Sequence, residues 1–92
     1  MPDDVKRVLT IINEKGLHAR ASAKFVELVE GYNAEAEVSK DGMSVTGDSI
    51  MGLLMLAAAR GCNIEVTTSG AEADALADAI EHLVGDKFGE GA

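Results

Sequence analysis

The segment "AEAEVSKDGMSVTG", residues 34–47, predicts the β-hairpin from which the fold of this chain can be worked out. Apolar residues alternate with polar ones on both sides of an Asp-Gly pair. Such a pair is a strong hairpin signal, because glycine accepts the positive φ that two-residue turns require. We therefore expect antiparallel strands at residues 34–39 and 43–47. The side chains expected to face the core are Ala36, Val38, Met43 and Val45.

Apolar spacing predicts the other elements on either side of this hairpin. They are a strand at 5–12, a helix at 19–30, a short helix within 48–61, a strand at 63–68 and a last helix from about Ser69. Ser49 is the expected N-cap of the short helix, and Ser69 and Glu72 have capping-box spacing. Within the short helix, the side chains expected inside are Leu53, Leu56 and Ala57. The β-α-β-β-α-β-α order predicts an α+β sandwich of one sheet and one helical layer.

Length and composition restrict the classes of protein to consider. The 92 residues argue for one domain, 1–92, with a structured core at about 5–85 and a frayed tail at about 86–92. The net charge of −8 counts against nucleic acid and anionic membranes as partners. No apolar run could span a membrane and the start is unlike a signal peptide, so we expect a cytoplasmic protein. Cys62 is the single cysteine, and neither a zinc motif nor a phosphate loop is present, so we expect no metal and no cofactor.

The segment "EKGLHARASAKF", residues 14–25, carries the candidate chemistry. Gly16 permits a sharp turn, which places His18 at the start of the next helix, where backbone N–H groups favour an anion. A positive charge is disfavoured there, which favours the neutral, nucleophilic imidazole. Arg20 can donate two hydrogen bonds to phosphate oxygens. A phosphoryl group on His18 would suit this arrangement, although a surface histidine or an imperfect cap is the simpler interpretation.

Two segments, "GLHARASAKFV" and "SIMGLLML", resemble the signature segments of HPr, the histidine-containing phosphocarrier family of the phosphoenolpyruvate-dependent phosphotransferase system. The resemblance covers about residues 5–88. It implies an open-faced β-sandwich, with a four-stranded antiparallel sheet in the order 1-4-2-3 and three helices on one face. It also implies that Enzyme I phosphorylates His18 on Nδ1 and that a IIA-type protein then receives the phosphoryl group. Arg20 matches the active-site arginine, and the backbone of Ala19 and Arg20 would bind the phosphate. Such a protein is a carrier and not an enzyme.

The short helix has more large apolar residues than one buried stripe can hold. By resemblance, it forms the docking patch for Enzyme I and IIA proteins. The docking residues expected from the resemblance are Ala21, Lys24, Ile50, Met51, Leu54 and Met55. Ser49 aligns with the serine that HPr kinase/phosphorylase modifies in some bacteria, although Asp48 stands where a basic residue is common. Phosphorylation of Ser49 would add negative charge beside an apolar docking surface.

Some questions stay open at this stage. Many family members have proline where this chain has Ala21, and the sequence does not distinguish the sugar branch from the nitrogen-related branch. We expect a monomer. The alternative function is a regulatory docking module of the same fold, which controls partner proteins without obligatory phosphotransfer.

Overall fold

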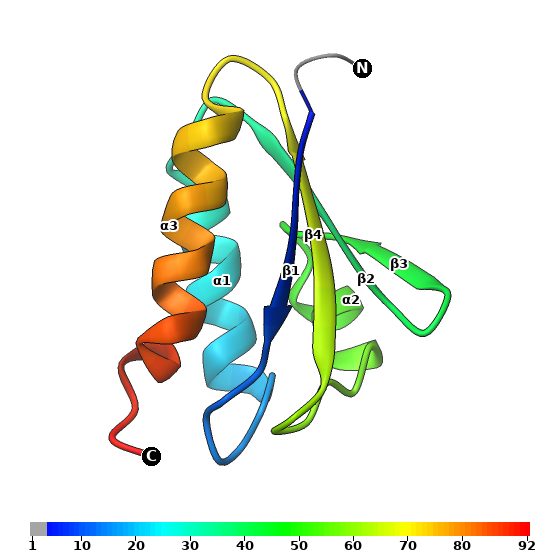
Figure 1. The fold of residues 1–92 in the computed structure, drawn as a ribbon, viewed down its shortest axis with the longest axis vertical. Helices are drawn as coiled ribbons and strands as arrows, with labels where there is room; N and C mark the ends of the chain where they lie inside the picture. The colour runs from blue at the N-terminus through cyan, green and yellow to red at the C-terminus, as the bar shows by residue number, and fades with distance from the viewer. Residues whose placement is uncertain (1–3) are drawn as a thin grey trace.

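The computed structural model describes residues 4–92, and its helices cover one face of a single four-stranded sheet (Figure 1). The elements in chain order are β1 (Val5–Thr10), α1 (Ala19–Glu30), β2 (Glu35–Lys40), β3 (Met43–Thr46), α2 (Ile50–Met55), β4 (Asn63–Ser69), α3 (Ala73–Gly85) and the 3₁₀ turn η1 (Lys87–Gly89). The α+β class and the β-α-β-β-α-β-α order are confirmed. Within the described part of the chain, no helix is long and apolar enough to cross a membrane.

The sheet has the order β1-β4-β2-β3, with every neighbouring pair antiparallel. This is the order that the resemblance implies and that the apolar pattern alone does not provide. β4 lies between β1 and β2, and it pairs with every residue of β1, the strand farthest from it in the sequence. The predicted hairpin joins β2 to β3, and its turn residues Asp41 and Gly42 have φ values of 50° and 84°.

The hydrophobic core lies between the sheet and the helices. Ala36 and Val38 of β2 are buried as predicted, and they face buried side chains of α1 such as Phe25 on the helical side. The prediction for Met43 is wrong, because 43% of its surface is exposed. β3 is the edge strand, so the helical layer leaves the end of this strand uncovered.

Two further details of the helices differ from the predictions. α2 ends at Met55, and Ala57 then takes a φ of 51° and is exposed, so Ala58 is buried in its place. The predicted capping box of α3 is absent, because the helix begins at Ala73 and Glu72 makes no side-chain cap bond. The Glu72 carboxylate instead accepts a hydrogen bond from the backbone N–H of Asn33 at 2.6 Å.

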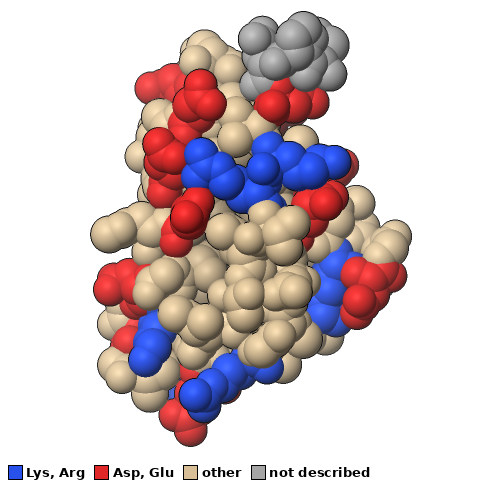
Figure 2. Space-filling view, viewed as in Figure 1, with Lys and Arg blue, Asp and Glu red and all other residues tan. Residues whose placement is uncertain are grey.

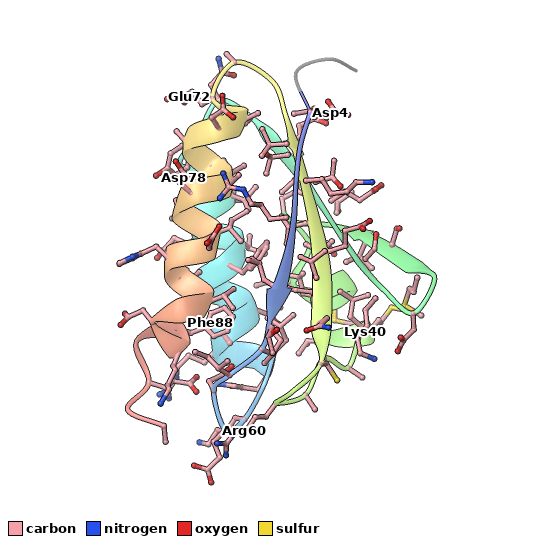
Figure 3. All side chains as sticks on the ribbon, viewed as in Figure 1. Asp4, Lys40, Arg60, Glu72, Asp78 and Phe88 are labelled. Atoms are coloured by element: carbon pink, nitrogen blue, oxygen red, sulfur yellow. The ribbon has the colours of Figure 1, made fainter. Side chains whose placement is uncertain are left out.

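The C-terminal segment is ordered against the helices, in contrast to the predicted frayed tail from residue 86. Phe88 lies in η1, just beyond the end of α3 (Figure 3), and its side chain is fully buried in the core. The carbonyl oxygen of Phe88 accepts a hydrogen bond from Lys24 Nζ at 2.7 Å. The structured part of the chain therefore extends past Gly85 to at least Glu90.

Candidate functional site

A tight loop between β1 and α1 positions His18. Gly16 has a φ of 65°, and a Cβ atom at this position would lie only 2.5 Å from the carbonyl oxygen of Ala58. The same oxygen accepts a hydrogen bond from the backbone N–H of Leu17 at 2.9 Å. Gly16 is therefore required for two reasons, the left-handed backbone and the close approach of the segment that follows α2.

His18 is the N-cap of α1, as the sequence predicts. Its Nδ1 accepts a hydrogen bond from the backbone N–H of Arg20 at 3.3 Å, and its carbonyl oxygen accepts one from Ser22 at 2.9 Å. Nδ1 therefore faces the end of the helix where backbone N–H groups point outward and the dipole is positive. An anion attached to Nδ1 would lie beside these N–H groups.

The other ring nitrogen of His18 contacts the C-terminal segment, which sequence reasoning did not anticipate. Nε2 is hydrogen-bonded to Oε2 of Glu90, and the second carboxylate oxygen accepts a hydrogen bond from Nδ2 of Asn13 at 3.1 Å. The same Nδ2 donates to the carbonyl oxygen of Gly16 at 2.9 Å. The sequence contains one indication that this segment packs against the protein. Phe88 is a large apolar residue in a segment otherwise typical of a disordered tail.

The contact with His18 also changes the acidity of Glu90. The hydrogen bond from His18 is the main cause that lowers the pKa of Glu90 below its usual value, and the bond from Asn13 adds to it. Partial burial of the carboxylate acts in the opposite direction. Glu90 therefore carries a negative charge next to Nε2 at neutral pH.

His18 opens onto a surface pocket of about 320 Å³. Lys15 and Arg20 line the pocket together with Glu14 and Glu90, so two cationic and two anionic side chains surround the ring. Arg20 is exposed, and its backbone N–H lies on the Nδ1 side of the ring, to which it is hydrogen-bonded. The expected pairing of His18 with Arg20 in one pocket is thus present, and the pocket could bind an anion of phosphate size.

The docking residues expected on α2 are exposed, whereas the two expected on α1 are buried or only partly exposed. Large apolar side chains of α2 are exposed, by 40% at Ile50, 69% at Met51, 36% at Leu54 and 64% at Met55. Ala21, however, is fully buried, so the expectation that it contacts a partner is wrong. The ammonium group of Lys24 is bound to Phe88 and is only half-exposed.

Ser49 caps α2 as predicted. Its Oγ accepts a hydrogen bond from the backbone N–H of Gly52 at 3.0 Å, and Ser49 itself is partly exposed. Asp48 beside it is exposed. The hydroxyl group lies at the start of the helix that carries the exposed apolar side chains.

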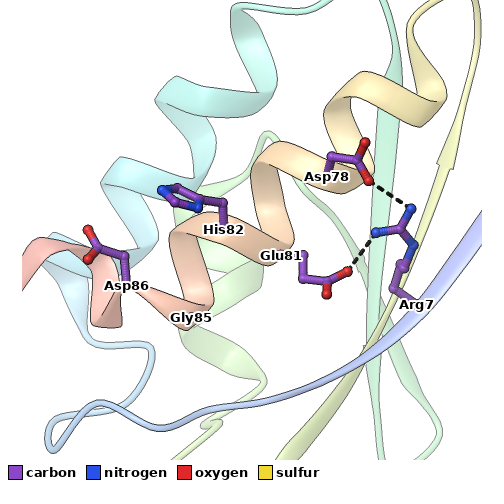
Figure 4. Close-up of a pocket in the computed structure, with 6 residues that line it drawn as sticks. All are labelled: Arg7, Asp78, Glu81, His82, Gly85 and Asp86. Atoms are coloured by element: carbon purple, nitrogen blue, oxygen red, sulfur yellow. Dashed lines mark hydrogen bonds and ion pairs between the residues drawn. The ribbon is translucent and has the colours of Figure 1, made fainter.

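A larger pocket of about 510 Å³ lies between β1 and α3, away from His18 (Figure 4). Its cation, Arg7, donates hydrogen bonds to Asp78 at 2.9 Å and to Glu81 at 2.6 Å. The bond to Asp78 and then that to Glu81 raise the pKa of Arg7 above its usual value. Figure 2 shows acidic side chains along the side of the molecule formed by α3. With its arginine already paired, this pocket has no evident anion site, and residues 4–92 contain no cluster suited to a metal ion.

Comparisons with known proteins find matches that cover nearly the whole chain. A family model described as "PTS HPr component phosphorylation site" matches residues 5–86. The phosphocarrier protein HPr of Neisseria meningitidis serogroup A is 46% identical over 87 residues, 95% of this chain and 98% of that protein. The phosphocarrier protein NPr of Shewanella violacea is 40% identical and covers 94% of each chain. The crystal structure of HPr-C-His from Thermoanaerobacter tengcongensis has a TM-score of 0.91 and 31% identity, over 96% of this chain and 99% of that one. With its fold, its N-terminal histidine cap and these matches, the chain belongs to the HPr family of phosphocarrier proteins.

Proposed function

We propose that His18 accepts a phosphoryl group on Nδ1 from phosphorylated Enzyme I and passes it to a histidine of a IIA-type protein. The observation that carries this proposal is the position of Nδ1 at the N-terminus of α1, in a pocket that Arg20 also lines. In the first transfer, the Nδ1 lone pair forms the new P–N bond while the P–N bond to the donor histidine breaks. In the second transfer, the Nδ1–P bond breaks and its electron pair returns to Nδ1.

The site supplies binding groups for the phosphoryl oxygens and no second catalytic group. In this proposal, the N–H groups of Ala19 and Arg20 in the first turn of α1 and the Arg20 guanidinium stabilise the negative charge of the phosphoryl group. Among the described residues that line the pocket there is no second histidine, and no cysteine, serine or threonine. The chemistry of each transfer is therefore completed by the partner protein, which is consistent with a carrier.

The exposed apolar surface of α2 supports a role in docking. Four large side chains of this helix are exposed, and methionines adapt to partners of different shape. The segment after α2 contacts the loop that holds His18, through the carbonyl oxygen of Ala58. A partner that binds α2 would thus be close to the loop of the phosphorylated residue.

Phosphorylation of Ser49 is proposed as a regulatory modification. A phosphate at the start of α2 would place about two negative charges next to exposed Asp48 and the apolar surface, which opposes docking. Ser49→Asp should therefore slow the phosphorylation of His18. Ser69→Asp, which adds the same charge at the far end of β4, is the matched control, and equal rates for the two variants would contradict the proposal.

The direct test is to incubate the protein with phosphoenolpyruvate and Enzyme I and to measure its intact mass. We expect an acid-labile gain of one phosphoryl group that is lost in His18→Ala. His82→Ala is the matched control, because His82 is the other histidine of the chain and is exposed on α3. No gain with the cognate Enzyme I, or a gain that persists in His18→Ala, would refute the proposal and favour a docking module without phosphotransfer.

A further inference from the structure

The contact between Glu90 and His18 is not explained by phosphoryl binding alone. A carboxylate in a pocket for a phosphoryl group would repel that group if both occupied the same place. Glu90, however, contacts Nε2, whereas Nδ1 faces the N-terminus of α1. The carboxylate and the proposed phosphoryl position therefore lie on different nitrogens of the ring.

The C-terminal segment is fixed firmly enough to hold Glu90 in this position. Phe88 anchors it in the core, and Lys24 binds the Phe88 carbonyl oxygen. Asn13, which is fully buried, donates one N–H to Glu90 and the other to Gly16, while its Oδ1 has no hydrogen-bond partner. An unpaired buried oxygen is unfavourable, so the two hydrogen bonds from Nδ2 are what hold the amide in this orientation.

We propose that Glu90 is a positioning residue that keeps a proton on Nε2 of His18 throughout the transfer cycle. A carboxylate only accepts hydrogen bonds at neutral pH, so the contact requires Nε2 to be the donor. The neutral ring then has its lone pair on Nδ1, the nitrogen at the helix end. The inference rests on the proposed phosphotransfer function.

The same proton matters for the second transfer. When Nδ1 attacks phosphorus, the ring retains Nε2–H and gains a positive charge, which Glu90 offsets. When the Nδ1–P bond breaks, its electron pair returns to Nδ1 and the ring leaves as neutral imidazole. If Nε2 lost its proton, the leaving group would be an imidazolate anion, and transfer would be slow. With Glu90 in place, no proton needs to move in either transfer.

The experiment compares wild type, Glu90→Ala and Glu90→Gln as phosphorylated proteins that donate to a IIA-type acceptor in single turnovers across a pH range. The charged groups around the ring are Glu14, Lys15, Arg20 and Glu90, so Glu14→Ala is the matched control for a change in pocket charge. We expect transfer by Glu90→Ala to be about tenfold slower at the alkaline end of the range, because a hydrogen bond to a charged group is lost. Glu90→Gln keeps the acceptor without the charge and should be slowed by a smaller factor.

A second measurement uses the unphosphorylated proteins. Nitrogen-15 NMR should detect an Nε2–H of His18 that exchanges with solvent about tenfold more slowly in wild type than in Glu90→Ala. Urea unfolding of each variant establishes that it is folded. Equal pH profiles for wild type and Glu90→Ala, an equal loss in Glu14→Ala, or faster transfer in Glu90→Ala would each overturn the role of Glu90. Absence of any phosphoryl gain in the wild type would instead refute the proposed function itself.

Discussion

Gly16 offers the clearest test of how the fold places His18, through the substitution Gly16→Ala. Two costs add at this position. The left-handed φ of 65° disfavours a residue with a Cβ by roughly 1–2 kcal/mol. The new Cβ would also lie 2.5 Å from Ala58 O and 2.9 Å from Ala59 Cα, where ordinary contacts begin at 3.4 Å.

The steric cost falls on backbone atoms, which cannot move aside as a flexible side chain can. Ala58 O is also bound to the N–H of Leu17, so a shift of one segment disturbs the other. Forced shifts of this kind cost roughly 1–3 kcal/mol. Gly16→Ala should therefore lower the free energy of unfolding by about 2–5 kcal/mol, a large part of the ~5–14 kcal/mol typical of a domain of this size.

Urea unfolding at constant m-value measures this change, and the chain provides matched controls. Gly42 and Gly61 have φ values of 84° and 90°, and a Cβ at either position meets nothing within 4 Å. Alanine at these positions has only the conformational cost, about 1–2 kcal/mol. If Gly16→Ala fell within 0.5 kcal/mol of Gly42→Ala, the close approach of Ala58 would have no energetic role and the reasoning would be refuted.

Three further predictions concern the C-terminal segment and α2. Phe88→Ala should lower the free energy of unfolding by about 3–5 kcal/mol in urea, because the ring is fully buried; a change below 1 kcal/mol would support a frayed tail. Because the bond from His18 lowers the pKa of Glu90, the unfolded chain binds a proton there more readily than the folded one. Glu90 should then stabilise the fold above its ordinary pKa of about 4.5, with the contribution lost as the pH falls through the lower folded value. Glu90→Gln should remove this component from unfolding curves measured at several acidic pH values, and an identical pH dependence would contradict it. Ser49→Ala should cost about 1 kcal/mol in urea, since the N–H of Gly52 loses its cap, whereas Ser49→Asn should be nearly neutral.

Local patterns in the sequence were sufficient for most elements of the fold. The helix at 19–30 and the hairpin turn at Asp41-Gly42 depend on side-chain spacing and on the φ that glycine permits, and both are present as predicted. The strand order was not predictable in this way, because alternation shows which face of a strand is buried and not which strand lies beside it. Met43 illustrates the same limit. It fits the regular alternation of apolar and polar residues, but its strand lies at the sheet edge and its side chain is exposed.

The candidate site was predictable on one side of the ring only. The position of Nδ1 follows from a helix that begins one residue after His18, which is local information. The contact of Nε2 joins residues 72 positions apart, and Asn13 and Glu90 are 77 apart. Such contacts form because the segment after α3 packs against the loop after β1. The spacing of residues along the sequence does not predict this packing.

The two restraints on the His18 ring differ in strength, and this difference makes the C-terminal segment part of the site. The bond from the Arg20 N–H to Nδ1 joins two neutral groups and is long, at 3.3 Å, so it orients the ring weakly. The bond to the Glu90 carboxylate is charge-assisted and roughly twice as strong as a neutral one. Because a weak bond at Nδ1 is readily exchanged for a phosphoryl group while a strong one at Nε2 holds the ring, the nitrogen that must react is the one held less tightly. The segment that appears dispensable in the sequence thus orients the residue on which the proposed transfer depends.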